Sequence, residues 1–592
     1  MKRTLNNWIR KYLQVILIII SLLVITPSTF AQEPDKDTQE PNSYSSDIRQ
    51  YLPTVMNIID LTVGHVEITQ AVQTDTNSVT LVANRQTVVR VYAQTNTSHS
   101  EDNMYVSISA YQGGSELPDS PLVLGPGTIP VTWSRAEINT SFNTFLPSTW
   151  LSGNVTLFVT VDPYDTIKEN DNSNNTVTKS LNFTNVPNLD ITVVPIRYTH
   201  TPTGKTYPAP STSFIQAAFE RFYPVDTVNV TVRSQYSYAA DLDKYSAWAN
   251  LLDIITTLKS NDGVSDSRVY YGLIPLVDGN GSTWWDGGYA GLGWVGYRES
   301  IGLADAYLMQ FQYYVNGKDT ATHEVGHNFN RKHAPCGDLS SADPNFPYVG
   351  GIVGQYGFDM SAWQVIPTSY KDIMGYCEPN WISDYTYLGL LENQLVYGLK
   401  ELTPQTTDSL YVRASIADDD TVVLQPVYAL PSSPDESPDE SEFSLEFLDA
   451  NGEVVAAHPV AVHLAEGNDF QVQSIHATVP KPSLPFSSLR LTKNGTTVSE
   501  RSLAQSSRFR TTQPTVYLDN GELILDWGMP QIPAMVRYTI DDGESWTTLG
   551  FDILEGELRM DPQSLPLGSL LFEIILADTT ESPLSTTWEH IP

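Results

Sequence analysis

One short segment of the sequence, from Ala321 to His333, constrains the fold more than any other feature. It contains His323 and His327, which are four residues apart. On a helix this spacing stacks the two imidazoles one turn apart on the same face, so both can reach a single ion. Glu324 follows the first histidine and points toward the open side of that ion. The segment therefore predicts a helix that carries a metal site with an adjacent carboxylate.

The full pattern is HExxHxxNxxH, and in it the sequence resembles the metzincin metallopeptidases. HExxH places two histidines on Zn²⁺ and a glutamate as general base. The resemblance implies that the helix ends, the chain turns sharply, and His333 becomes the third zinc ligand. Asn330 stands where these enzymes have glycine, and asparagine is the next residue most tolerant of positive φ. The implied reaction is internal hydrolysis of a peptide bond by a zinc-bound water that Glu324 activates.

A second segment, Asp372 to Tyr376, resembles the metzincin Met-turn. The resemblance implies that Met374 lies beneath the metal. It also implies that Tyr376 is a switchable extra ligand and a donor to the transition state, as in astacins and serralysins. Without this context, Met374 is simply a core methionine and Tyr376 a packing residue. Ala334, directly after the third histidine, fits no well-known subfamily, so the subfamily stays open.

The chain has two cysteines, Cys336 and Cys377, and they flank these two motifs. Two cysteines exclude a disulfide-dense scaffold and a multi-cysteine zinc site. If bonded, the pair ties the exit of the zinc helix to the Met-turn. The alternative is a free thiol that blocks the zinc as a switch.

In metzincins an edge strand upstream of the zinc helix pairs with an extended substrate, and the position-matched segment here is Gly288–Gly296. Its glycines predict close approach of a substrate backbone, and main-chain pairing tolerates many sequences. The predicted contacts are Gly288, Tyr289, Gly291 and Trp294. Trp284 and Trp285 precede this segment, and the aromatic residues either line subsites or a glycan platform, or pack the wall of the cleft.

The order of strand-like and helix-like segments along the sequence predicts a multidomain chain. We expect a central α/β (α+β) metzincin-like catalytic domain flanked by immunoglobulin-like all-β sandwich domains. Val161–Thr176 resembles the last hairpin of CARDB domains. Its loop carries four acidic residues that could bind calcium, but Asn/Asp turns need no metal. These residues are Asp162, Asp165, Glu169 and Asp171. The expected segments are a signal peptide (1–31), a flexible leader (32–55), a CARDB-like sandwich (56–188), the peptidase domain (189–400), a sandwich (401–510) and an immunoglobulin- or fibronectin-like sandwich (511–592).

The net charge of the chain and its N-terminal segment exclude further classes of function. The formal net charge of −35 argues against nucleic-acid binding and against docking on anionic lipid. A basic start, a short apolar run and small residues before a cleavage point after Ala31 predict export, with no membrane anchor left in the mature chain. The leading interpretation is a secreted zinc endopeptidase that acts on extended polypeptides or glycoproteins. The alternatives are a zinc amidase of cell-wall peptide and an adhesin or glycan-binding protein with a vestigial zinc site.

Overall fold

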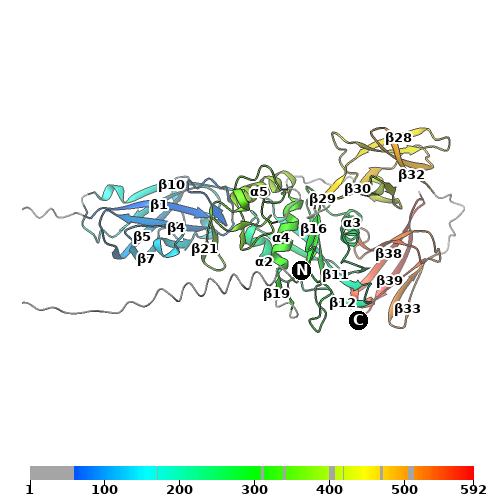
Figure 1. Ribbon diagram of the computed structural model, residues 1–592, viewed down its shortest axis with the longest axis horizontal. Helices are drawn as coiled ribbons and strands as arrows, with labels where there is room; N and C mark the ends of the chain where they lie inside the picture. The colour runs from blue at the N-terminus through cyan, green and yellow to red at the C-terminus, as the bar shows by residue number, and fades with distance from the viewer. Residues whose placement is uncertain are drawn as a thin grey trace, which may run out of the picture. The chain divides into compact units, whose positions relative to one another are not determined.

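The computed structural model describes residues 59–169, 171–308, 313–337, 342–398, 407–417, 419–466, 471–503, 513–579 and 581–591. The predicted signal peptide and leader lie outside these residues. Within them, no helix is both long enough and apolar enough to span a membrane. The described residues are mostly β-structure with a small number of helices, and they form several separate hydrophobic cores (Figure 1).

The first β domain packs two sheets around one core. One sheet has the order β1-β4-β8, and the other has the order β3-β10-β9-β5-β6, with β7 also pairing with β5. Residues that alternate along the strands, such as Val155, Leu157 and Val159 of β9, point into the shared core. The strands of these sheets are β1 (Leu61–Thr69), β3 (Leu81–Val82), β4 (Val88–Thr95), β5 (Glu101–Gln112), β6 (Ser115–Glu116), β7 (Leu122–Ile129), β8 (Phe142–Phe145), β9 (Gly153–Val161) and β10 (Thr176–Thr184). The short strand β2 (Val72–Gln73) pairs instead with β20 (Tyr356–Asp359) of the next part of the chain.

The next part of the chain alternates strands and helices. Its helices are α2 (Ile215–Phe222), α3 (Tyr245–Asp262), α4 (Gly317–Asn328) and α5 (Asp384–Gly398). Its strands are β11 (Leu189–His200), β12 (Lys205–Tyr207), β13 (Val228–Val232), β14 (Tyr236–Ala240), β15 (Val269–Ile274), β16 (Gly291–Gly293), β17 (Glu299–Leu303), β18 (Ala306–Leu308), β19 (Tyr313–Val315), β20 (Tyr356–Asp359), β21 (Gln364–Ile366), β22 (Lys371–Asp372) and β23 (Asn380–Trp381).

The main sheet of this domain has the order β12-β11-β15-β17-β16, and β13 and β14 pair with β11. Strands β11, β13, β14, β15 and β17 run parallel, and β16 is an antiparallel strand at the edge. Side chains of neighbouring residues in β11 point to opposite faces of the sheet, because side chains alternate along a strand. Val193 packs in the core that contains α2 and α4, whereas Val194 packs in the core that contains α3. Helices therefore cover both faces of a mixed sheet, as the alternating pattern predicts.

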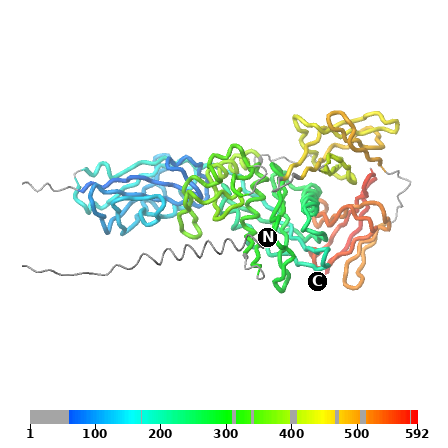
Figure 2. The backbone as a smooth tube through the Cα atoms, viewed as in Figure 1, coloured from blue at the N-terminus to red at the C-terminus, as the bar shows by residue number. Residues whose placement is uncertain are grey.

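Two further β domains follow. In the third domain a sheet of order β25-β24-β30-β29 packs on one of order β28-β27-β31-β32, and in the fourth β33-β34-β37 packs on β36-β35-β38-β39. Figure 2 traces the backbone of these two domains in yellow to red. Their strands are β24 (Thr407–Ile416), β25 (Val422–Leu424), β26 (Tyr428–Ser432), β27 (Phe443–Leu448), β28 (Val454–Val460), β29 (His463–Glu466), β30 (Gln471–Pro480), β31 (Ser488–Lys493), β32 (Thr496–Ser502), β33 (Thr515–Asp519), β34 (Glu522–Asp526), β35 (Ala534–Thr539), β36 (Thr547–Ile553), β37 (Glu557–Met560), β38 (Gly568–Leu576) and β39 (Leu584–His590).

Candidate metal centre

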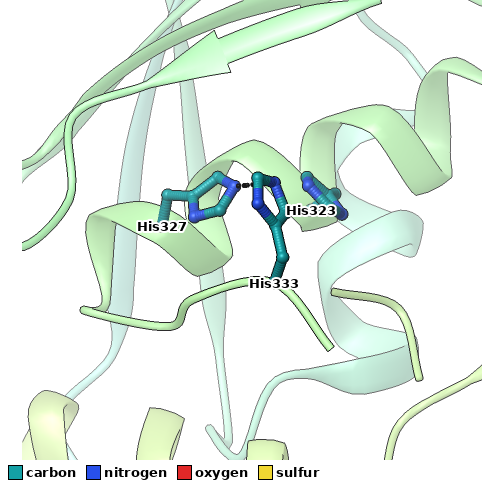
Figure 3. Close-up of side chains that lie close together, drawn as sticks. All are labelled: His323, His327 and His333. Carbon is teal, nitrogen blue, oxygen red and sulfur yellow. Dashed lines mark hydrogen bonds between the residues drawn. The ribbon is translucent and has the colours of Figure 1, made fainter. Parts of the chain in front are cut away.

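Helix α4 carries the first two histidines and ends in a Schellman turn. The amide of Arg331 donates to Gly326 O and that of Asn330 donates to His327 O, which is the double hydrogen bond of this motif. Asn330 has φ of 59°, the left-handed conformation that such a turn requires. The turn reverses the chain and brings His333 back beside the helix that it has just left (Figure 3).

The three imidazoles converge on one point. The ligand nitrogens of His323, His327 and His333 all lie within 4.8 Å of one another, and the three side chains are buried. Nε2 of His327 lies 3.1 Å from Nε2 of His333, close to the roughly 3.3 Å edge expected between ligands of a tetrahedral zinc ion. Nε2 of His323 is buried and has no hydrogen-bond partner among the described residues. A buried, unpartnered nitrogen aimed at two others fits a metal ion, so this triad can hold one.

Backbone carbonyls fix the orientation of two rings. Nδ1 of His323 lies 2.7 Å from Ile373 O, and Nδ1 of His327 lies 2.7 Å from Arg331 O. A carbonyl can only accept, so each Nδ1 carries the proton and each Nε2 keeps a lone pair. Burial lowers the pKa of His323 to about 4. Burial, then the nearby His333 and His323, hold the pKa of His327 well below its usual value. The rings are thus neutral, which is the form that binds metal.

Glu324 lies against the edge strand β16. A methyl group added at Gly291 would overlap Glu324 Oε1 and Cγ, and one at Gly293 would lie 2.6 Å from Glu324 O. Burial raises the pKa of Glu324 well above its usual value, and a bound dication would act in the opposite direction. The sequence predicted that these glycines permit close approach of a substrate backbone. In the structure, the backbone and side chain of Glu324 make that close approach.

We expect Gly291→Ala to lower kcat/KM for peptide cleavage about 100-fold, because a shift of about 1 Å in a catalytic group costs that much. Bound zinc should be unchanged, since the nearest atoms to the added methyl all belong to Glu324 and none to the three histidines. The matched control is Gly279→Ala, where an added methyl has nothing within 4 Å and φ is not positive. Equal activity of the two variants would show that the packing against Gly291 does not set the position of Glu324.

Met374 lies directly under α4. A methyl group at Gly326 would overlap Met374 Sδ and would lie 3.1 Å from its Cε, so glycine at this position lets the turn fit under the helix. The turn itself is held by Asp372, whose buried carboxylate accepts from the amides of Met374 (2.8 Å) and Ser383 (2.9 Å). Met374 was predicted to lie beneath the metal, and in the structure it packs against the helix that carries His323 and His327.

Tyr376 and the disulfide complete the wall of the site. The Tyr376 hydroxyl lies 2.8 Å from Nε2 of His333, and Tyr376 is 43% exposed, which leaves it room to move. The predicted disulfide is confirmed: Cys336 and Cys377 are bonded, with their Cα atoms 5.8 Å apart. Because neither cysteine is free, the alternative of a zinc-blocking thiol is excluded. The amide of Tyr376 donates to Cys336 O (3.0 Å), so the bond and the tyrosine belong to one substructure.

Trp294, which we predicted as a substrate contact, is buried in the structure. Its side chain is fully buried, and its Nε1 donates to Thr256 Oγ1 at 2.8 Å. Its backbone forms a β-bridge with Ala465 of β29, and the next amide, of Val295, donates to Leu464 O. Trp294 therefore joins the central sheet to the third domain. The interpretation of this residue as wall packing fits the structure.

The other aromatic and glycine positions differ in exposure. Gly288 is exposed with φ of 106°, and Tyr289 is half-buried beside it. Trp284 is buried, with its Nε1 donating to Pro275 O, and Trp285 Nε1 donates to Tyr289 O. Gly288 thus lies exposed just before the edge strand, Tyr289 beside it contacts the rings of Tyr245 and Trp248, and Trp284 packs inside.

The loop after β9 shows no grouping for calcium among its described residues. Asp162 accepts from the amides of Thr166 and Ile167, and Glu169 accepts from Leu61 N and Asn175 Nδ2. The carboxylates of Asp165 and Asp171 accept from Asn172 and Ser173. Protein donors from the turn thus account for all four acidic residues, and no three of them form a metal-binding group.

Several residues that hold the site could not be identified from the sequence. The Tyr223 hydroxyl donates to Thr322 O (2.8 Å) beneath α4. The Arg298 guanidinium donates to Asn328 O, at the end of the same helix, and to Asn393 Oδ1 (2.6 Å). Such contacts join elements far apart in sequence and follow no spacing rule. Of these residues, only Arg298 follows a general rule, because a positive charge stabilises the negative C-terminal end of a helix.

Comparisons with known proteins leave the family open. No protein-family model matches this chain, and no curated protein matches it. Among solved structures, the chain is similar to the CARDB domain of the PF1109 protein from Pyrococcus furiosus in complex with di-metal ions (17% identity, 24% of this chain and 100% of that one, TM-score 0.15). It is also similar to a putative cell surface protein from Methanosarcina acetivorans (20% identity, 22% and 93%, TM-score 0.15).

A third similarity is longer. It is to OgpA from Akkermansia muciniphila, at 10% identity over 68% of this chain and 92% of that one, with a TM-score of 0.20. Identities and TM-scores of this size carry no argument about chemistry, so the function must be argued from the site itself.

Proposed function

We propose that this chain is a secreted zinc-dependent endopeptidase of the metzincin type. The observation that carries the proposal is the convergence of three buried imidazoles, with Nδ1 of His323 and of His327 held by carbonyls, beside a buried glutamate. Three histidine ligands with one open position are the donor set of catalytic zinc. The Cys336–Cys377 disulfide supports an oxidising, extracellular setting.

In the proposed hydrolysis, Glu324 and Tyr376 have separate roles. Zinc, when bound, would supply Lewis acidity toward a water molecule and the scissile carbonyl. Glu324 accepts the proton of the attacking water and later delivers it to the leaving amine. The Tyr376 hydroxyl, now on His333, is placed to donate to the oxyanion once it moves from that nitrogen. Burial of the triad keeps bulk water from competing for these groups.

The edge strand offers a place for an extended polypeptide. Strand β16 pairs with β17 on one side and ends the described sheet on the other. An extended chain can add there through main-chain hydrogen bonds. The third domain limits the length of this edge, because Trp294 and Val295 already pair with Ala465 and Leu464. We therefore propose pairing along Gly288–Gly293, with Tyr289 as a side-chain contact, for polypeptide or glycoprotein substrates.

The test uses residues 32–592 as purified, secreted protein. Zinc bound to the triad is taken as the amount lost in His327→Ala, and cleavage of casein and of a mucin-type glycoprotein is followed with and without a chelator. We expect one zinc ion at the triad and cleavage that stops with the chelator and returns with added zinc. If the triad binds zinc and neither substrate nor a random peptide library is cut, the endopeptidase proposal fails and an adhesin-type function is favoured.

A further inference from the structure

A second set of metal-ligating side chains lies at the carboxyl ends of two parallel strands. Strand β11 ends at His200 and β14 ends at Ala240, and these two residues are paired in register. Asp241 and Asp243 follow β14 immediately. The carboxyl ends of parallel strands share one edge of a sheet, so the topology itself brings the three side chains together. One ligand atom of each lies within 4.8 Å of the others.

The histidine of this cluster is buried and aimed at the carboxylates. The His200 side chain is 8% exposed, and Nε2 and Asp241 Oδ1 are buried atoms without a hydrogen-bond partner among the described residues. Nδ1 lies 3.1 Å from Thr203 Oγ1, whose own proton goes to the carbonyl of His200. Nδ1 is therefore the donor, and Nε2 presents a lone pair to the two aspartates.

The separations match ligands around an ion better than they match hydrogen bonds. Nε2 of His200 is 3.8 Å from Asp241 Oδ1 and 3.5 Å from Asp243 Oδ2. A hydrogen bond would be near 2.9 Å, whereas ligands of tetrahedral zinc stand roughly 3.3 Å apart. The neighbouring cation, Lys244, reaches the other oxygen of Asp241 (3.1 Å) and leaves Oδ1 facing the histidine.

We propose that His200, Asp241 and Asp243 bind a divalent transition metal of the zinc type. One imidazole and two carboxylates suit zinc, whereas calcium prefers oxygen ligands alone. Asp243 is 48% exposed, so water completes the coordination. The ion would join the end of β11 to the segment that leads into α3. It would also lie beside Trp284, whose ring centroid is 6.4 Å from that of His200. The role is structural and does not depend on the proposed peptidase activity.

The test starts from secreted protein, wild type and single variants, from which all metal has been removed. Each protein is dialysed against zinc, and the zinc ions bound per chain are then counted. We expect two zinc ions in the wild type and one in each of His200→Gln, Asp243→Asn and His327→Ala. The Asp243 side chain is half exposed, so Asp243→Asn should fold normally. Loss of zinc in this variant then reports loss of a ligand and not misfolding. The control is Asp286→Asn, an exposed carboxylate of the same domain outside the cluster, which should keep both ions. Casein cleavage should survive in Asp243→Asn and vanish in His327→Ala.

The variants separate this site from the triad. A wild type with one ion that is lost only in His327→Ala would overturn the second site and leave the peptidase proposal intact. A wild type with one ion that is lost only in His200→Gln and Asp243→Asn would support the second site and overturn the triad. Equal zinc content in wild type and Asp243→Asn, with two ions in each, would also overturn the proposal.

Discussion

Replacing Glu324 with glutamine should lower kcat/KM for peptide cleavage about a thousandfold, because positioned general bases contribute on this scale. Glutamine has the same shape as glutamate, so it can fill the space beside Gly291 without disturbing β16. It cannot accept a proton from water. The three histidines are untouched, so zinc content should stay at the wild-type level. Both quantities are measured on the same preparation, by metal analysis and by initial rates on casein.

The matched control is Glu392→Gln. Glu392 is an exposed residue of α5 in the same domain, so loss of its charge should leave the rate unchanged. Retained zinc with lost activity in Glu324→Gln alone would assign the missing step to proton transfer. A Glu324→Gln variant that binds zinc and cleaves at the wild-type rate would remove Glu324 from the mechanism.

The sequence was most informative where a spacing rule acts within one element. The four-residue spacing of His323 and His327 required a helix, and Asn330 has the backbone conformation that the resemblance implied. Local hydrogen bonds alone, from Asn330 to His327 and from Arg331 to Gly326, build that turn. Such features depend on neighbouring residues, so a linear pattern records them.

The sequence was least informative about which partner a residue meets. It showed that Gly291 allows a close approach, but it did not show that Glu324 makes that approach, because glycine records only a missing side chain. It placed Trp294 at a cleft, whereas the tryptophan packs against β29, about 170 residues later in the chain. The carbonyls of Ile373 and Arg331 that orient the imidazoles belong to the backbone, and any residue could supply them.

Removing the disulfide with the pair Cys336→Ser and Cys377→Ser should cost about 4 kcal/mol of the unfolding free energy of the central domain. The bond closes a loop with a sequence separation of 41 residues, and its loss gives the unfolded chain that freedom back. The loop begins just after His333 and ends just after Tyr376, so the zinc ligand and the tyrosine should loosen together. Zinc affinity and activity should therefore fall before the β domains unfold.

Because the chain has several domains, global unfolding does not report this effect, and the measurement must follow the central domain alone. Urea titrations monitored by zinc release and by residual cleavage meet that need, and the midpoint should move to lower urea in the serine variant. A reducing agent should shift wild type to the same midpoint and should leave the variant unchanged, since its only two cysteines are gone. If both proteins release zinc at the same urea concentration, the bond does not hold the third ligand against the Met374 turn. The contacts of Ala334 with Met374 O and of Tyr376 with Cys336 O would then suffice to keep the two segments together.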